Sequence, residues 1–341
     1  MGRIFSVGLC FAVTLLAGCA GQSGVTPPGA SVPGSAATQR AAARLPWAAA
    51  RSLARPDTEH SWMAPDAKQR ELLYVSDDAT YDVYVFAYPQ GKLVGTLTGF
   101  SAPGGLCSDS KGDVFIPNSL GSTILEYAHG GASPIATFND RPGAYPGSCD
   151  VNPMTGKLTV ANTGSGNPNW PGDIAIFPAP SGTPLFYKAM GHPYSCAYDP
   201  EGNLFVDGED AAFDNFAFGE LKAQGKRYHK VALSQPISLA GGVAWDGTSV
   251  AVGDVYNAVI YRFSIGGSKG NLNGSTPLSG AVATWQFDLD RGRIVVPSSN
   301  PQDQSASAIL KYNYPSGGAA LKAFGAGIVS DPVGATVSRP R

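Results

Sequence analysis

The chain has 341 residues, of which 15% are charged, and its formal net charge is −2. A nucleic-acid-binding protein needs a stripe of Lys and Arg against the phosphates, and the repetitive part of this chain has no such cluster. We therefore expect no nucleic acid among its partners.

Residues 1–19 have the pattern of a bacterial signal peptide. Arg3 gives a positive start, and the apolar residues 4–16 fall short of the roughly 20 residues that a membrane-spanning helix needs. The stretch ends in Leu-Ala-Gly-Cys, which resembles the lipobox of lipoproteins and implies a lipid on Cys19. The alternative is a secretory signal with a chance cysteine. Because Ala20 follows the cysteine, the resemblance implies the outer membrane of a Gram-negative envelope, with membrane contact through the lipid anchor only.

Residues 20–61 are rich in Ala, Pro, Gly, Ser and Arg and show no apolar periodicity. Such a segment cannot bury enough apolar surface to order itself, so we expect a disordered tether. The remaining stretch, 62–338, is long enough for one closed β domain with its own core.

One sequence pattern recurs six times in this stretch. It consists of an apolar run, an Asp or Asn, turn residues and a second apolar run, at residues 62–76, 104–118, 147–162, 194–208, 241–254 and 283–298. Each copy predicts two short strands joined by a tight turn. The copies are spaced about 45 residues apart, which is typical of four-stranded propeller blades.

A third and a fourth apolar run follow each copy, which predicts four antiparallel strands per unit. The tail 331–337 resembles the first strand of a further unit and would pair with residues 72–76. Such pairing of the N- and C-terminal strands closes the ring and removes exposed sheet edges. The expected fold is therefore all-β, a six-bladed β-propeller of four-stranded blades.

Residues 103–127 resemble an NHL repeat, the unit of a family of six-bladed propellers. Gly112, Asn118, Ile124 and Tyr127 fit the spacing of that repeat, as do the corresponding residues of the fifth copy. The family's Arg before the Ile is replaced by Thr123. The resemblance implies the fold and says little about function, because propellers host binding proteins, scaffolds and enzymes.

We expect function on one face of the ring, where the loops between second and third strands and between blades emerge. Aromatic rings and carboxylates suit sugars, whose C–H patches stack while their hydroxyls form hydrogen bonds. The predicted partner is a glycan, a peptide or an envelope protein. The candidate ligand-binding residues are Tyr81, Tyr145, Trp170, His192, Tyr194, Asp207, Glu209, Asp254 and Tyr256. Alternatively, these are ordinary loop residues on a solvated rim.

An enzymatic alternative comes from the fold. Six-bladed lactonases and gluconolactonase-like hydrolases hold a divalent cation with Asn, Asp and Glu side chains where the innermost strands begin. Here those positions are free of carboxylates and amides, as in residues 103–105, 146–148, 193–195, 240–242 and 282–284. We therefore predict no catalytic residue, metal or cofactor, and keep a hydrolase or lyase, and an envelope assembly scaffold, as alternatives.

Cys107, Cys149 and Cys196 occupy near-equivalent places on the innermost strands of successive blades. Their odd number and regular spacing do not suggest a disulfide framework. We expect small, buried packing residues, with a soft-metal site as the minor alternative.

Overall fold

The computed structural model describes residues 60–166, 171–212, 215–300 and 302–341. The signal peptide, Cys19, nearly all of the expected tether and Trp170 lie outside the described residues. Within these ranges, no helix has the length and apolar character required to cross a bilayer. The helices there are short 3₁₀ turns, η2 (Ala67–Gln69), η3 (Ser119–Gly121) and η4 (Gln304–Ala306).

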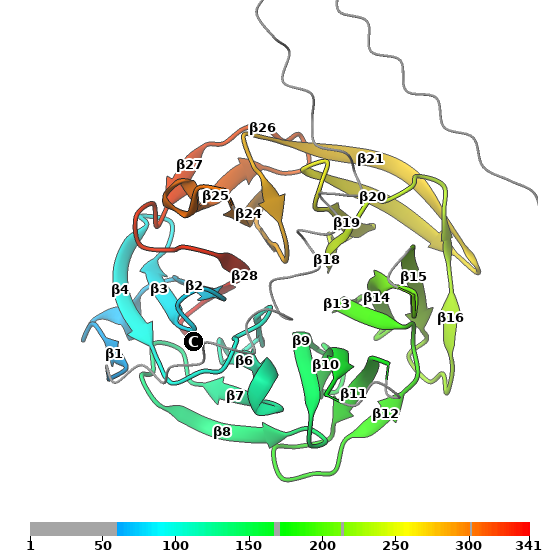
Figure 1. Ribbon diagram of the computed structural model, residues 1–341, viewed down its shortest axis with the longest axis horizontal. Coiled ribbons are helices and arrows are strands. Elements are labelled where there is room, and N and C mark those ends of the chain that lie inside the picture. Colours follow the sequence, from blue (N-terminus) through cyan, green and yellow to red (C-terminus); the bar gives the residue numbers. More distant parts are fainter. Residues whose placement is uncertain (1–59, 167–170, 213–214, 301) are drawn as a thin grey trace, which may run out of the picture. The chain divides into compact units, whose positions relative to one another are not determined.

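Six antiparallel sheets surround a central axis as the blades of a propeller, which confirms the expected fold (Figure 1). From the axis outward, blade 1 contains β28 (Pro332–Ser338), β2 (Leu72–Asp77), β3 (Val83–Ala87), β4 (Lys92–Leu97) and β1 (Trp62–Met63). Blade 2 contains β5 (Cys107–Ser108), β6 (Val114–Asn118), β7 (Thr123–Tyr127) and β8 (Pro134–Asn139). Blade 3 contains β9 (Ala144–Val151), β10 (Leu158–Ser165), β11 (Asp173–Phe177) and β12 (Leu185–Tyr187).

The other three blades follow the same order from the axis outward. Blade 4 contains β13 (His192–Tyr198), β14 (Leu204–Glu209), β15 (Phe216–Leu221) and β16 (Tyr228–Lys230). Blade 5 contains β18 (Ala240–Trp245), β19 (Val250–Asp254), β20 (Val259–Gly266), β21 (Lys269–Ser279) and β17 (Ala232–Leu233). Blade 6 contains β22 (Ala283–Thr284), β23 (Asp288–Asp290), β24 (Arg293–Ser299), β25 (Ala308–Asn313) and β27 (Lys322–Phe324). The short β26 (Gly318–Ala319) pairs with β21 and joins blades 5 and 6.

The core lies between neighbouring blades, and strand β2 shows why. Successive side chains of a strand point to opposite faces of its sheet. Leu72 and Tyr74 therefore join a cluster with Ile116 of blade 2. Leu73 and Val75 pack on the other side, in a cluster that includes residues of blade 6. Both faces of the sheet are thus covered, which explains why every residue of β2 is buried.

The two ends of the propeller sequence meet in blade 1. Strand β28 runs antiparallel to β2, with Leu72 opposite Ser338 and Val75 opposite Ala335. Figure 1 shows this red strand beside the blue ones. The expected ring closure by the C-terminal tail is confirmed. It leaves the innermost edge of blade 1 occupied by a strand more than 250 residues away along the chain.

The prediction for two of the three propeller cysteines is wrong. Cys107 of β5 and Cys149 of β9 form a disulfide, with 5.6 Å between their Cα atoms. Cys107 lies opposite Phe115 and Cys149 lies opposite Val160, and all four side chains belong to the cluster between blades 2 and 3. Cys196 is free and buried, as expected for a packing residue.

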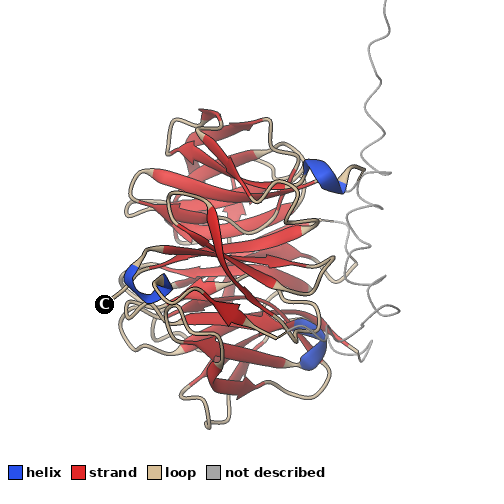
Figure 2. Ribbon diagram, turned by 90° about the vertical axis from the view of Figure 1, so that its left-hand side faces the viewer, coloured by secondary structure: helices blue, strands red, loops and turns tan. Residues whose placement is uncertain are grey.

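Seen from the side, loops emerge at both ends of the sheets (Figure 2). On one side the innermost strands begin and the second strands end, and we call this side the loop face. Asp78 follows β2, Ser119 follows β6 and Glu209 ends β14 on this face, while β9 and β13 begin there.

Candidate functional site

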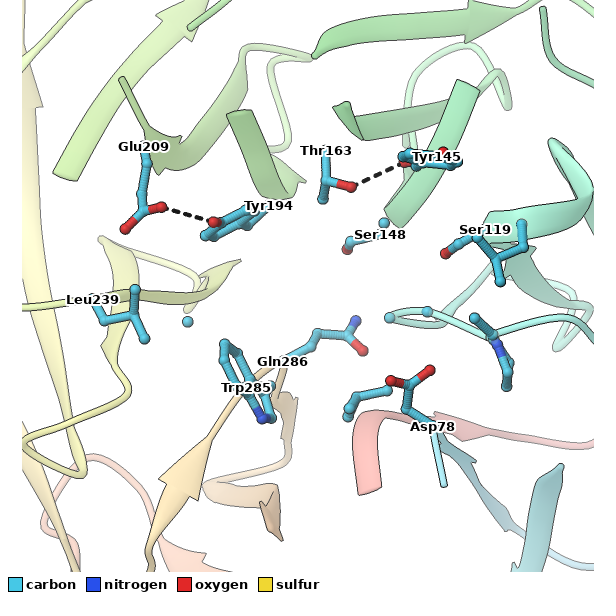
Figure 3. Close-up of a pocket in the computed structure, with 18 residues that line it drawn as sticks. Asp78, Ser119, Tyr145, Ser148, Thr163, Tyr194, Glu209, Leu239, Trp285 and Gln286 are labelled. Atoms are coloured by element: carbon cyan, nitrogen blue, oxygen red, sulfur yellow. Dashed lines mark hydrogen bonds between the residues drawn. The ribbon is translucent and has the colours of Figure 1, made fainter. Parts of the chain in front are cut away.

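A cavity of about 160 Å³ opens where the channel meets the loop face (Figure 3). All six blades contribute to its wall. Its lining residues are Asp78, Ala102, Pro103, Gly104, Gly105, Ser119, Leu120, Tyr145, Gly147, Ser148, Thr163, Tyr194, Glu209, Leu239, Gly241, Trp285, Gln286 and Val333.

Blade 4 supplies a tyrosine and a carboxylate that are joined to each other. Tyr194 lies near the start of β13 and Glu209 at the end of the neighbouring β14. The Tyr194 hydroxyl donates a hydrogen bond of 2.8 Å to Glu209 Oε2. Hydrogen bonds to charged groups are stronger than neutral ones, so this contact fixes both side chains at the cavity wall.

The aromatic wall also contains Tyr145 of β9 and Trp285 of blade 6. The innermost strand of blade 6 is interrupted between β22 and β23, and Trp285 and Gln286 lie in this gap. Figure 3 shows Trp285 and Tyr194 on the same side of the cavity. Large apolar faces with a few polar groups are the usual lining of small-molecule sites.

Gln286 closes the bottom of the cavity across the channel. Its Oε1 accepts hydrogen bonds from the backbone N–H groups of Leu106 (2.9 Å) and Ala335 (3.1 Å). Its Nε2 donates to the carbonyl oxygen of Leu106 at 2.5 Å. The amide therefore ties blades 2, 6 and 1 together, and a second cavity on the opposite side of the channel also borders Gln286.

Glycine at the start of the innermost strands has a packing reason. The N–H of Gly105 donates to Gly147 O at 2.7 Å across blades 2 and 3. A Cβ on Gly104 would stand 2.3 Å from the same carbonyl oxygen. A side chain at Gly104 would therefore collide with the backbone of blade 3, so glycine is required where these two innermost strands approach each other.

Asp78 presents a carboxyl group to the cavity from the opposite side to Glu209 (Figure 3). Within the described part of the chain, no hydrogen bond or ion pair reaches this carboxyl. Burial, together with the nearby carboxylates of Asp331 and Asp77, raises the pKa of Asp78 to about 8. At neutral pH this group is largely protonated in the absence of a ligand.

Ser148 adds an unused polar atom to the wall. Its side chain is only 2% exposed, and its Oγ has no hydrogen-bond partner among the described residues. A buried hydroxyl without a partner costs free energy relative to one that is satisfied. A ligand that donated to or accepted from Ser148 would remove this cost.

The structure brings three of the nine predicted ligand-binding residues together at the cavity, namely Tyr145, Tyr194 and Glu209. Asp207 is fully buried, and its Oδ1 accepts from the N–H of Ser195. Asp254 is also fully buried and accepts from the N–H of Ser238 at 2.9 Å. Asp207 thus supports strand β13, and Asp254 supports the loop before β18.

Three of the remaining predicted residues lie on the loop face outside the cavity lining. His192 starts β13, and its Nδ1 bonds to the carbonyl oxygen of Thr163 at 2.9 Å, while burial lowers its pKa. Tyr81 occupies a turn with a φ of 61°. Tyr256 follows β19. Trp170 lies outside the described residues.

Sequence reasoning missed Trp285, Gln286 and Ser148. A signal for the first two was present, because most of the other innermost strands have Gly or Ser at the corresponding positions, as in Gly104–Gly105 and Gly241–Gly242. Two large residues at positions where the repeat mostly has small ones indicate a functional role for this part of blade 6. In the described ranges, no group of three or more His, Cys, Asp or Glu side chains is arranged to hold a metal ion.

No family model matches the sequence, and no curated protein matches it. The resemblance to NHL repeats therefore stays a prediction. Solved structures do match. A chain of a nidogen/laminin complex has a TM-score of 0.64 and 11% identity, with 80% of this chain and 99% of that chain covered.

Two further matches are proteins of unknown function. The one from Bacteroides caccae has a TM-score of 0.60 and 12% identity, covering 79% of this chain and 99% of that chain. The one from Desulfotomaculum acetoxidans has a TM-score of 0.56 and 10% identity, covering 80% of this chain and 100% of that chain. At these identities the matches bear on the fold alone.

Proposed function

We propose that this protein is a non-catalytic binding protein of the bacterial cell envelope that recognises a glycan through the loop-face cavity. The observation that carries the proposal is the composition of the wall, in which Tyr145, Tyr194 and Trp285 lie beside the carboxyl groups of Asp78 and Glu209. Aromatic rings stack against the C–H faces of a sugar, and carboxyl oxygens accept hydrogen bonds from its hydroxyls.

The size of the cavity limits which ligands can fit. Its volume of about 160 Å³ is below the roughly 300 Å³ at which pockets for drug-sized ligands begin. It suits a single sugar ring, such as the terminal residue of a glycan, with the rest of the chain lying across the loop face. A peptide strand or a protein partner would need a longer groove or a wider patch.

Two features support the envelope location. The lipobox-like sequence at Cys19 would anchor the protein by its lipid. The Cys107–Cys149 disulfide is of a kind that persists in oxidising compartments such as the periplasm and the cell surface. Both favour a lipoprotein exposed outside the cytoplasm, at the outer membrane if the cell is Gram-negative.

One observation favours a second candidate, a hydrolase or lyase. Asp78 has a raised pKa and faces an open cavity, which is the behaviour of a general acid. Glu209 faces it across the cavity (Figure 3). Two carboxyl groups on either side of a sugar are the machinery of many glycoside hydrolases.

Calorimetric titration of purified protein with a panel of monosaccharides and short glycans tests the proposal. We expect saturable binding that is lost in Trp285→Ala, with the sugar recovered chemically unchanged. Turnover of the sugar would establish the enzymatic candidate instead. Absence of binding across the panel would overturn the proposed function and direct attention to peptides or envelope proteins.

A further inference from the structure

The ionisable groups of the cavity wall are unbalanced in charge. Asp78 and Glu209 line it, whereas no Lys, Arg or His of the described residues belongs to the lining. A site built for acidic sugars would present the opposite pattern, because Arg and Lys are the usual partners of carboxylates.

The described part of the protein supplies no cation to Asp78. Several of its Arg side chains form ion pairs with other carboxylates, for example Arg141 with Asp173, and Arg262 with Asp246 at 2.6 Å. Asp78 takes part in no ion pair of the described residues. Its carboxyl group is therefore available to solvent or to a ligand.

Asp78 is the carboxyl group best placed to receive a cation. Two neighbouring acids already have partners, since Asp77 Oδ2 accepts from the N–H of Ser330 at 2.6 Å and Asp331 accepts from the hydroxyl of Ser299. Asp78 accepts no such bond from the described residues, and the two neighbours repel its ionised form. An ammonium group in the cavity would relieve this repulsion and lower the pKa of Asp78.

The rest of the wall fits the same ligand. Trp285 and Tyr194 offer ring faces, which attract cations as well as C–H groups. The unpartnered Ser148 Oγ is a free polar contact for a neighbouring hydroxyl or for the ammonium itself. An N-acetyl group would remove the positive charge of the sugar and make the sugar larger, which disfavours it in a cavity of about 160 Å³.

From this arrangement we infer that the cavity selects amino sugars, meaning sugar residues with a free ammonium group, over neutral, N-acetylated and acidic sugars. The inference rests on the proposed glycan-binding function. The Asp78 carboxyl binds the ammonium group, and the wall of Trp285 and Tyr194 holds the sugar ring.

The experiment is a calorimetric titration of purified protein near pH 7 with matched sugars. The pairs are glucosamine with glucose and galactosamine with galactose, and N-acetylglucosamine and glucuronic acid complete the set. We expect at least one amino sugar to bind tenfold or more tightly than its neutral partner, and glucuronic acid to bind more weakly than glucose. Added salt should weaken amino-sugar binding and leave neutral-sugar binding almost unchanged.

Asp78→Asn supplies the decisive variant, because it keeps the shape of the side chain and removes the charge. It should abolish the preference for the amino sugar, so that the amino sugar and its neutral partner bind the variant with affinities within about twofold of each other. Glu201→Gln, an exposed acid in the turn before β14, is the matched control and should change neither affinity.

The outcomes separate the two levels of the proposal. Equal binding of both members of each pair would overturn the preference for amino sugars and leave glycan binding intact. An amino-sugar preference that persists in Asp78→Asn, or that salt does not weaken, would overturn the role of Asp78. If none of the sugars binds, glycan binding itself fails.

Discussion

The hydroxyl of Tyr194 lies 2.8 Å from Glu209 Oε2, so that two adjacent strands of blade 4 are joined at the cavity wall. Glu209 is buried apart from 7% of its surface. The contact therefore has two effects. It satisfies a carboxylate that is nearly out of water, and it holds an aromatic ring toward the space where we place the sugar.

Replacing Tyr194 by Phe tests both effects. Because a hydrogen bond to a charged group contributes about 1.5–3 kcal/mol, the free energy of unfolding should fall by about 1.5 kcal/mol. Sugar affinity should also fall, since the released Glu209 can adopt other rotamers. Urea unfolding and calorimetric titration measure the two quantities. Tyr261→Phe, on strand β20, is the control, and equal behaviour of the two variants would contradict the role of the Tyr194 hydroxyl.

Trp285→Ala should remove the larger ring face of the cavity. Truncation of a central aromatic contact typically costs about 2 kcal/mol or more, which corresponds to a roughly 30-fold loss of sugar affinity. Trp285 is only partly buried, so the propeller of the variant should still fold, as circular dichroism can show. The matched control is Trp62→Ala on the outer strand β1, where 46% of the side chain is exposed. Unchanged affinity in Trp285→Ala would place the ligand elsewhere.

The raised pKa of Asp78 predicts a pH dependence of stability. Between its ordinary value of 3.8 and about 8, the folded state keeps a proton that the unfolded chain has lost. The free energy of unfolding therefore falls as pH rises through this window. Asp207, with a pKa raised to about 8 by burial, acts in the same direction.

Asp78→Asn removes one contribution to this decline. Relative to wild type, the variant should gain stability between pH 5 and pH 8, as measured by the urea midpoint at each pH. The difference between the two proteins should be larger at pH 8. A difference that is the same at both values would show that Asp78 titrates normally in the folded protein.

The Cys107–Cys149 disulfide should contribute strongly to the stability of the ring. It closes a loop with a sequence separation of 42 residues, and bonds of this kind contribute about 2–4 kcal/mol. Cys107→Ser, Cys149→Ser and the double variant should all lose about the same amount, because each change breaks the same bond. Urea unfolding measures this. A double variant as stable as wild type would show that the thiols are not joined.

The fold could be predicted from the sequence because each repeat determines its own strands from residues that are close together in the chain. Each copy carries its own alternation of apolar residues and its own turn, so the strands follow from short windows. The tail near Val337 resembles a first strand without the rest of its blade, and an open ring needs such a strand beside Leu73. The closure of the propeller by its C-terminal strand could therefore be predicted from the same repeat.

The site could be predicted only in part, because its residues meet through the ring and not along the chain. Tyr145, Tyr194 and Glu209 could be assigned to the loop face from their places in the repeat. Sequence could not distinguish Glu209, which lines the cavity, from Asp254, which is fully buried, since each of them ends the second strand of its blade. Their difference depends on the packing of neighbouring blades.

The disulfide was missed for a related reason. The spacing of the cysteines indicated near-equivalent packing positions, but Cys107 is offset by one residue, since it lies opposite Phe115 whereas Cys149 lies opposite Val160. Because successive side chains of a strand point to opposite faces, this offset turns the two thiols toward each other between blades 2 and 3. Near the axis the innermost strands of blades 2 and 3 approach closely, as the 2.7 Å hydrogen bond from Gly105 to Gly147 shows. Cys107 and Cys149 meet in the same region.

A crystal structure of the protein with bound glucosamine tests the central claim most directly. We expect the sugar in the loop-face cavity, with its ring against Trp285 and Tyr194 and its ammonium group within hydrogen-bond distance of Asp78. An empty cavity with the sugar bound at another place, in crystals grown at saturating sugar, would contradict the claim that this cavity is the recognition site.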